Sequence, residues 1–466
     1  MRTHARAWVL VLTGIGSLMV ALDTLVVATA LSAIRVDLHA SLEELEWTVN
    51  AYNLTFAVLL MTGAALGDRL GRRRLYATGL GLFAAASAAC ALAPDAGWLI
   101  AARTLQGVGG AMIVPLGLAL LSAAFPPERR GTAIGIFSAI TGLAVAAGPL
   151  VGGAVVQGLS WHWIFWLNVP IGAVAAPLAM RKMRESYGPR TAIDVTGLLL
   201  VSGGAFGVVW GLVRGNQSGW GSPEVITALV AGVVLLGAFV RWQVQTPTPM
   251  LPPQLFRSRA FTAGNAAIFL TFASLFTGVF FFAQLLQVVL GHDALGAGLR
   301  LLPWTATFIT VAPVAGALAD RIGERLLLSV GLSLQAAGFL WLVPVADPGL
   351  TYGQLIGPFV LAGVGVSMAI PCAQNAVVGG VDSDSIGAAA GVNSMMRELG
   401  GVFGIAVTVA VFASSGDYGS VLGFLDGFRP AIVTAAGFAL VGAVCGVAVP
   451  ARQRHGMVQP DLALAS

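Results

Sequence analysis

Apolar runs of about 20 residues recur along the whole chain, and each is long enough to cross the hydrocarbon core of a bilayer as one helix. We count about 14 of them, and the polar stretches between them, of at most about 20 residues, are too short to form another folded domain. Only 10% of the residues are charged, against about a quarter in soluble domains. The sequence therefore predicts an all-α polytopic membrane protein. The predicted spans are 8–31, 48–66, 75–93, 98–122, 133–157, 163–180, 195–213, 225–240, 261–289, 299–319, 326–345, 353–378, 388–413 and 430–449.

A basic turn, Gly67-Asp68-Arg69-Leu70-Gly71-Arg72-Arg73-Arg74, separates the second and third apolar runs. Its glycines allow two helices to turn back tightly, and Asp68 can pair with the neighbouring arginines. Loops that face the cytoplasm are enriched in Arg and Lys, and about 19 of the 25 such residues fall on the same side as this turn. The charge pattern predicts a multi-pass protein of the cell (inner or plasma) membrane with both termini in the cytoplasm.

The second half of the chain repeats this turn. Residues Gly316 to Arg325 follow Gly63 to Arg72 almost position for position. A turn repeated in each half is typical of a transporter built from two bundles of six spans, so spans 7 and 8 are predicted to be an inserted pair. The predicted units are an N-terminal bundle at 1–190, the inserted spans and a linker at 191–250, a C-terminal bundle at 251–450 and a cytoplasmic tail at 451–466.

Asp23 is the one acidic residue of the first span, about 15 residues from its start and therefore deep in the bilayer. A carboxylate at that depth is costly and normally faces a cavity or a partner. Desolvation disfavours its charged form, so Asp23 is a candidate proton carrier, and it is also a candidate contact for a cationic substrate. The alternative is a structural role, in which Asp23 stays bonded to a neighbouring helix.

Arg103 begins a polar face in the fourth span. Arg103, Gln106, Gly107 and Gly110 follow the spacing of one helix face. A buried arginine needs an acidic or carbonyl partner, and Asp23 is the intramembrane acid available in this half. We therefore predict that Arg103 pairs with Asp23 and modulates its protonation. The alternative places Arg103 at the outer interface, with its charged end in the headgroup region.

Small residues follow one face of the fifth span. Ala144, Gly148 and Gly152 recur every four residues, which permits close approach of a neighbouring helix. Pro149 removes one backbone hydrogen bond and can bend the span. By itself this pattern predicts tight packing and no particular activity.

The thirteenth span has a second polar face, made by Asn393, Arg397, Gly400 and Gly404. Arg397 is a candidate substrate or gate contact, and a bond to helix carbonyls is the structural alternative. Glu398 follows it directly and is expected to point elsewhere. Other intramembrane polar residues that line a cavity or form interhelical hydrogen bonds are Gln284, Gln287 and Asn375.

Signatures of soluble enzymes and of nucleotide-driven pumps are missing. The chain has no phosphate-loop lysine motif, no nucleophile elbow and no metal-ligand spacing of His and Cys. The sequence therefore predicts no enzymatic activity, metal or cofactor, and no nucleic-acid partner, since the net charge of +4 follows the loop pattern. The acidic stretch 43–47 is expected to be a solvated helix edge.

Together these motifs resemble the major facilitator superfamily, and more narrowly its 14-span drug:proton antiporters of the EmrB/QacA type. The loop Gly67–Arg74 is similar to the superfamily's signature loop between spans 2 and 3. The stretch Gly135–Gly153 is similar to the antiporter motif of span 5, except that Ala144 stands where a glycine is usual. Further stretches that resemble motifs of this branch are Leu22–Val27, Arg103–Gly110, Trp161–Gly172 and Gly400-Gly401.

The resemblance implies a major facilitator fold of two six-helix bundles plus two inserted spans. It implies proton-driven export of hydrophobic, often cationic, drugs or antibiotics by alternating access, with Asp23 and Arg103 in proton coupling and the proton gradient as the energy source. The predicted conformational latch is Gly67, Asp68, Arg69, Gly71, Arg72 and Arg73. The predicted antiporter motif is Gly135, Gly148, Pro149, Gly152 and Gly153. The predicted substrate cavity is Asp23, Gln106, Gln284, Asn375, Asn393 and Arg397.

Two other functions stay open at this point. One is a proton-linked transporter, most simply an exporter, of a single metabolite such as an amino acid, sugar or siderophore. The other is a membrane sensor or assembly partner that transports nothing. The predicted partners are a small substrate, protons and the lipid bilayer, and the sequence leaves open whether an adaptor protein takes part.

Overall fold

The computed structural model describes residues 2–125, 133, 137, 140, 144, 147–148, 150–188, 194–247, 249, 251–381 and 386–450. Within these residues the chain consists of helices and connecting turns without a strand, as the sequence predicts. The predicted tail 451–466 lies outside them. The helices are α1 Arg2–Asp37, α2 Leu42–Leu70, α3 Arg72–Ala91, α4 Ala96–Ala124, α6 His162–Trp166, α7 Asn168–Lys182, α8 Val195–Ser218, α9 Pro223–Gln245, the 3-10 helix η1 Pro253–Arg257, α10 Arg259–Val288, α11 Ala294–Arg300, α12 Leu302–Thr305, α13 Thr307–Ile322, α14 Glu324–Val345, α15 Tyr352–Gly379, α16 Ile386–Ala413 and α17 Val421–Ala448.

Twelve helical stretches in the described part are long and apolar enough to cross a membrane. Each overlaps a span predicted from the sequence, so the class of a multi-pass helical membrane protein is confirmed. The two remaining predicted spans are α3, a helix of 20 residues that begins with three arginines, and 133–157, part of which lies outside the described residues. A total of 12 to 14 spans is compatible with the structure, and the number 14 stays a prediction.

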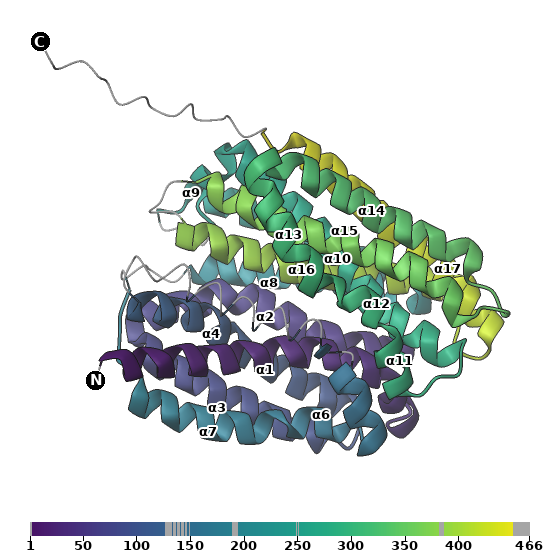
Figure 1. The fold of residues 1–466 in the computed structure, drawn as a ribbon, viewed down its shortest axis with the longest axis horizontal. Helices are drawn as coiled ribbons and strands as arrows, with labels where there is room; N and C mark the ends of the chain where they lie inside the picture. The colour runs from purple at the N-terminus through teal and green to yellow at the C-terminus, as the bar shows by residue number, and fades with distance from the viewer. Residues whose placement is uncertain are drawn as a thin grey trace, which may run out of the picture.

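The helices α1 to α4, α6 and α7 lie side by side in one group, coloured purple to blue in Figure 1. In this group α4 packs along both α2 and α3, and α7 packs on α3. Glycines of α4 permit this close approach. A side chain at Gly107 would meet the backbone of Tyr52 in α2, and one at Gly109 would meet the backbone of Phe83 in α3.

A second group contains α10 to α17, coloured teal through green to yellow in Figure 1. Its central helix, α10, contacts α15, α16 and α17 and buries three consecutive aromatic residues, Phe280 to Phe282. Two glycines of the predicted polar face in the thirteenth span, Gly400 and Gly404, lie against the α10 backbone at Phe269 and Ala273. The two groups meet where α16 packs on α2 and where α10 packs on α1.

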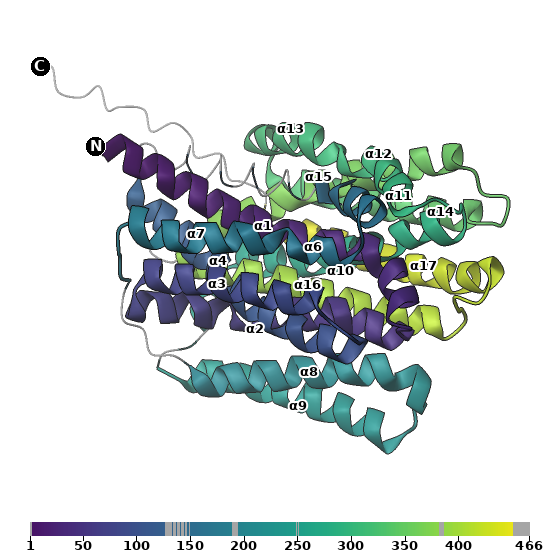
Figure 2. The ribbon, with the colours of Figure 1, turned by 90° about the horizontal axis from the view of Figure 1, so that it is seen from below.

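The helices α8 and α9 form an antiparallel hairpin that lies beside the two groups, as Figure 2 shows. Helix α8 packs against α2 and α16, so it touches one helix of each group. Phe239 of α9 joins a buried cluster with Leu251 and Leu255. Trp47 of α2 contributes to this interface with its ring 5.7 Å from that of Phe206. An inserted pair of spans would occupy such a position, and the exact unit boundaries at 190, 250 and 450 stay predictions.

The turn repeated in the sequence is also repeated in the structure. Gly71 separates α2 from α3 with φ 109°, and Gly323 separates α13 from α14 with φ 88°. Backbone with such a positive φ is readily adopted only by glycine, because a Cβ would clash with the chain. The same residue at equivalent places thus gives each half its sharp helix-to-helix reversal.

Candidate functional site

Asp23, in α1, lies at the centre of a buried polar cluster. Its carboxylate accepts a hydrogen bond from Nη1 of Arg103. It also accepts from Nε2 of Gln106 at 2.7 Å and from Nδ2 of Asn168 at 2.9 Å. The side chains of Asp23 and Arg103 are each only 1% exposed. The predicted pairing of Asp23 with Arg103 is therefore confirmed.

Arg103, in α4, has partners on several sides. Its Nη1 also donates to Oε1 of Gln106 at 2.7 Å, and its Nε donates to the backbone carbonyl of Thr48 at 3.1 Å. The guanidinium carbon lies 4.2 Å from the ring centroid of Tyr52. A buried cation needs such partners, because removing it from water is costly unless its donors are satisfied. The alternative that Arg103 reaches the headgroup region is wrong, since its side chain is buried.

Two members of this cluster are not singled out by the sequence: Ser87 of α3 and Asn168 of α7. Both are buried. Their contact completes the site, because the Oγ of Ser87 accepts from Gln106 at 2.7 Å and from Asn168 at 3.2 Å. Each is a polar residue within an apolar stretch, and that isolation is the signal that could have identified it. The cluster thus joins α1, α3, α4 and α7 around one carboxylate.

The basic loop is attached to the segment that follows α7. Asp68 pairs with Arg72 at 2.7 Å, as predicted. Glu185 lies 3.5 Å from Nε of Arg73 and 3.7 Å from Nε of Arg74, and it also accepts from the backbone N–H of Arg73 at 2.8 Å. Its carboxylate was not predicted as part of the latch. The loop is therefore held by both a neighbouring carboxylate and a distant one, which ties the α2–α3 turn to the end of the N-terminal group of helices.

Comparison with known proteins agrees with this architecture. Residues 13–405 match the Major Facilitator Superfamily. The chain belongs to this superfamily of transporters. It is 37% identical to the tetracenomycin C resistance and export protein of Streptomyces glaucescens, over 88% of this chain and 77% of the relative. It is 32% identical to the methylenomycin A resistance protein of Bacillus subtilis, over 89% and 90% of the two chains. It is 33% identical to the cephamycin export protein CmcT of Amycolatopsis lactamdurans, over 97% and 94%.

Solved structures share the fold at much lower sequence identity. The crystal structure of the peptide transporter POT in complex with sulfate has a TM-score of 0.69 to this chain at 16% identity. The match covers 95% of this chain and 94% of that one. At this identity the likeness concerns the helical fold alone, and it agrees with the two groups of helices in Figure 1.

In the second half of this superfamily member, Arg397 of α16 pairs with the residue that follows it. Its Nε donates to Oε1 of Glu398 at 3.0 Å, and its guanidinium carbon lies 5.6 Å from the ring centroid of Phe272. The expectation that Glu398 points elsewhere is wrong, because a long arginine side chain can bend back to its neighbour. Oε2 of Glu398 has no hydrogen-bond partner among the described residues.

The other predicted cavity residues lie in separate places. Asn393 is buried and donates from Nδ2 to Oδ1 of Asn265 in α10 at 3.3 Å. Gln284 of α10 is buried and accepts a hydrogen bond from the hydroxyl of Tyr418. Asn375 is exposed near the end of α15. The structure thus brings Gln106 to Asp23 but does not bring the C-terminal residues to the same cluster, and their roles in a substrate cavity stay predictions.

The described part of the predicted antiporter motif lies at a close helix contact. Gly148 is buried. A side chain at Gly152 would meet Val26 and Thr29 of α1, and one at Gly153 would meet the backbone of Ala294 at the start of α11. These glycines therefore occupy a point where both halves of the molecule approach one another. Gly135 and Pro149 lie outside the described residues.

The acidic stretch 43–47 is not the solvated helix edge that we expected. It forms the first turns of α2, and Glu46 is only 1% exposed. Oε1 of Glu46 accepts from Nδ2 of Asn50 at 3.3 Å. One turn further, both polar atoms of Asn53 are buried without a hydrogen-bond partner in the described part of the chain. Glu46, Asn50 and Asn53 share one face of the helix. Helix α2 therefore contributes a buried polar stripe, which we did not predict from the sequence because apolar residues surround it.

Proposed function

We propose that this protein exports drug-like or antibiotic molecules across the cell membrane in exchange for protons. The observation that supports this most directly is the Asp23 carboxylate, buried within the helices of a transporter and bonded to Arg103, Gln106 and Asn168. Intramembrane acids with such partners are typical of proton relays. The relatives named for antibiotic resistance and export support the substrate class.

The chemistry of the cluster suggests how a proton would change the conformation. Protonation of Asp23 removes the negative charge that Arg103 faces, which leaves the guanidinium with Gln106 and the Thr48 carbonyl as its acceptors. The link between α1 and α4 weakens as a result, and these helices can shift relative to one another. Loss of the proton restores the ion pair. A site that opens alternately to the two sides of the membrane would thereby couple proton entry to substrate exit.

The proposed orientation places both termini and the basic loop Gly67–Arg74 in the cytoplasm, following the distribution of Arg and Lys. The substrate would bind between the two groups of helices, where α1 and α2 face α10 and α16. The loop, held by Glu185, would act as a latch that stabilises one of the two conformations.

A narrower function is the second candidate: export of one compound. It is favoured by the names of three relatives, which each specify a single antibiotic: tetracenomycin C, methylenomycin A and cephamycin. Another relative is named a multidrug resistance protein, which favours the broader function. A panel of unrelated compounds separates the two, because only a multidrug exporter lowers the accumulation of several of them.

The test is accumulation of drugs and dyes in cells that express the wild type or Asp23→Asn, with and without a protonophore. Wild-type cells should exclude at least one compound, and both the substitution and collapse of the proton gradient should abolish exclusion. Asp426→Asn is the matched control, because this aspartate is 61% exposed and its arginine contact is 3.9 Å long. It should export normally at equal expression.

Two results would contradict the proposal. Full export by Asp23→Asn would remove Asp23 from proton coupling, and export that survives the protonophore would remove the proton gradient as the energy source.

A further inference from the structure

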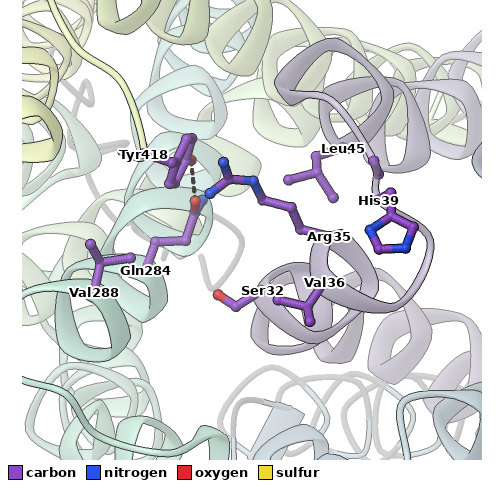
Figure 3. A pocket seen from close by; sticks show the side chains of 9 residues that line it. Ser32, Arg35, Val36, His39, Leu45, Gln284, Val288 and Tyr418 are labelled. Atoms are coloured by element: carbon purple, nitrogen blue, oxygen red, sulfur yellow. Dashed lines mark hydrogen bonds between the residues drawn. The ribbon is translucent and has the colours of Figure 1, made fainter. Parts of the chain in front are cut away.

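A cavity of about 550 Å³ lies at the end of the molecule opposite the N-terminus. Its walls come from the end of α1, the α1–α2 connection, α10 and the loop between α16 and α17, so both groups of helices contribute. Figure 3 shows Ser32, Arg35 and Val36 on one side and Gln284 and Val288 on the other. Ligand pockets commonly measure about 300–1,000 Å³, and the volume of this cavity lies within that range.

The charged group in this wall is Arg35, and its surroundings differ from those of Arg103. None of the ion pairs or side-chain hydrogen bonds among the described residues involves the Arg35 guanidinium. Among the described residues its contact is with the ring of Tyr418, whose centroid lies 4.5 Å from the guanidinium carbon. A ring face offsets only a small part of a cation's charge. The N–H donors of Arg35 are therefore available to a molecule in the cavity.

Tyr418 is held firmly in this position. Its hydroxyl donates to Oε1 of Gln284, whose Nε2 in turn donates to the carbonyl of Phe280 at 2.6 Å. Its ring packs 5.2 Å from that of Phe412. Burial raises the pKa of Tyr418, so the phenol stays neutral and does not itself neutralise Arg35. The cation is thus fixed in place by a rigid aromatic support that supplies no negative charge.

We propose that this cavity is a substrate site for organic anions, in which Arg35 binds a carboxylate, sulfonate or phenolate and the apolar walls bind the body of the molecule. An arginine offers paired N–H donors that match such groups. Leu45, Val36 and Val288 supply the apolar surface. The inference rests on the proposed export function and narrows its substrate class, since a site lined by an unpaired cation disfavours cationic drugs.

Glu46 is the acidic residue to consider as a partner that would neutralise Arg35. It lies within electrostatic reach of Tyr418. Its Oε1 is bonded to Asn50, and it makes no ion pair with Arg35. It is buried in α2 rather than part of the cavity wall. The basic side chains of Arg35 and His39 line the cavity, whereas Glu46 does not.

The experiment compares two xanthene dyes of similar size and opposite charge: fluorescein, an anion, and rhodamine 123, a cation. Binding is measured by fluorescence anisotropy with the purified full chain in phosphatidylcholine nanodiscs, which carry no net charge. The wild type should bind fluorescein more tightly than rhodamine 123. Arg35→Gln should raise the Kd for fluorescein by about tenfold or more, because a charged hydrogen bond is lost. The Kd of Arg35→Lys for fluorescein should lie between those of the wild type and Arg35→Gln.

Arg300→Gln is the matched control, because Arg300 also lies over a tyrosine, with its guanidinium carbon 5.4 Å from the centroid of Tyr352, but does not line the cavity. It should leave the Kd unchanged. If Arg35→Gln does not fold, Val36→Trp serves instead, since Val36 is 76% exposed at the cavity and tolerates a larger side chain. Val36→Trp should prevent fluorescein from binding, because the larger side chain fills the cavity.

Three results would overturn the anion site: no specific binding of fluorescein by the wild type, tighter binding of rhodamine 123, or an equal loss with Arg300→Gln. Binding reports on this site without any proton gradient. The export function is tested separately by Asp23→Asn in cells, so failure of the anion site and failure of the export function can be told apart.

Discussion

Each half of the molecule has an arginine paired with a carboxylate inside its helices, and the two pairs differ in their surroundings. Asp23 and Arg103 are each 1% exposed at their side chains, and the carboxylate has three side-chain donors around it. Arg397 and Glu398 are 25% and 6% exposed, and Oε2 of Glu398 has no partner in the described part of the chain. The first pair is saturated, whereas the second has hydrogen-bonding capacity left.

The two pairs also differ in whether they join two helices or lie within one. Asp23 and Arg103 come from α1 and α4, so their bond holds two helices together. Arg397 and Glu398 are neighbours in α16, so their bond holds no other helix. A change of charge at Asp23 must therefore alter helix packing, while a change of charge at Glu398 can be absorbed locally. This difference explains why the N-terminal pair is the better candidate for coupling a proton to a conformational change.

The largest expected effect is that of Arg103→Ala. It leaves the Asp23 carboxylate buried without its cation, which should lower the free energy of unfolding by about 3–5 kcal/mol. The measurement is thermal or denaturant unfolding in detergent, followed by circular dichroism. Arg69→Ala is the control, since Arg69 is exposed in the basic loop and should cost less than about 0.5 kcal/mol. Equal stability of Arg103→Ala and wild type would refute the view that this pair holds α1 to α4.

The same acid-to-amide change in the two halves tests the comparison directly. Asp23→Asn should lower the free energy of unfolding by about 2 kcal/mol, because charged hydrogen bonds to Arg103, Gln106 and Asn168 are weakened. Glu398→Gln should change it by less than about 1 kcal/mol, since removing a buried, half-satisfied charge relieves desolvation. The same unfolding assay measures both. If Glu398→Gln lowers the free energy of unfolding more than Asp23→Asn does, the pair of Asp23 and Arg103 is not the one that stabilises the fold.

Smaller effects than those of Arg103→Ala and Asp23→Asn are expected at the repeated turn. Gly71→Ala and Gly323→Ala each force a Cβ into backbone with positive φ, which should cost about 1–2 kcal/mol. Gly71→Ala should be the worse of the two, because its Cβ would also lie 2.8 Å from the Glu185 carboxyl carbon. Unfolding midpoints of the two variants give the ranking. Gly81→Ala, where the added Cβ meets no atom within 4 Å, is the control and should match or exceed wild-type stability.

Much of the fold could be predicted from the sequence, because a bilayer imposes a minimum length on every apolar run. The predicted spans overlap all twelve helical stretches of the described part that are long and apolar enough to cross a membrane. The repeated glycine turn was found from sequence identity alone and recurs in the structure at Gly71 and Gly323. The pairing of Asp23 with Arg103 could also be predicted, since two opposite charges in adjacent apolar surroundings have few other partners.

Other parts of the site could not be read from the sequence. Asn168 and Ser87 are isolated polar residues in apolar stretches, but they are neutral, so nothing in the sequence pairs them with Asp23. We expected Glu46 to be solvated because other acidic residues surround it. The helix period instead places it in the interior, whereas Glu44 forms a capping box with Ser41 at the start of α2. The cavity at Arg35 depends on Tyr418 and Gln284, which lie hundreds of residues away in the chain.

The sequence by itself determined which segments enter the membrane and which charges they bring with them. These properties are local, because the cost of placing a residue in lipid depends on that residue and its immediate neighbours. Only the tertiary structure decided which charges are neutralised. Arg103 meets the carboxylate of Asp23, whereas among the described residues Arg35 meets the ring of Tyr418 and no carboxylate. Coulombic and hydrogen-bond energies fall steeply with distance, so this outcome depends on how the helices pack, which their composition does not specify.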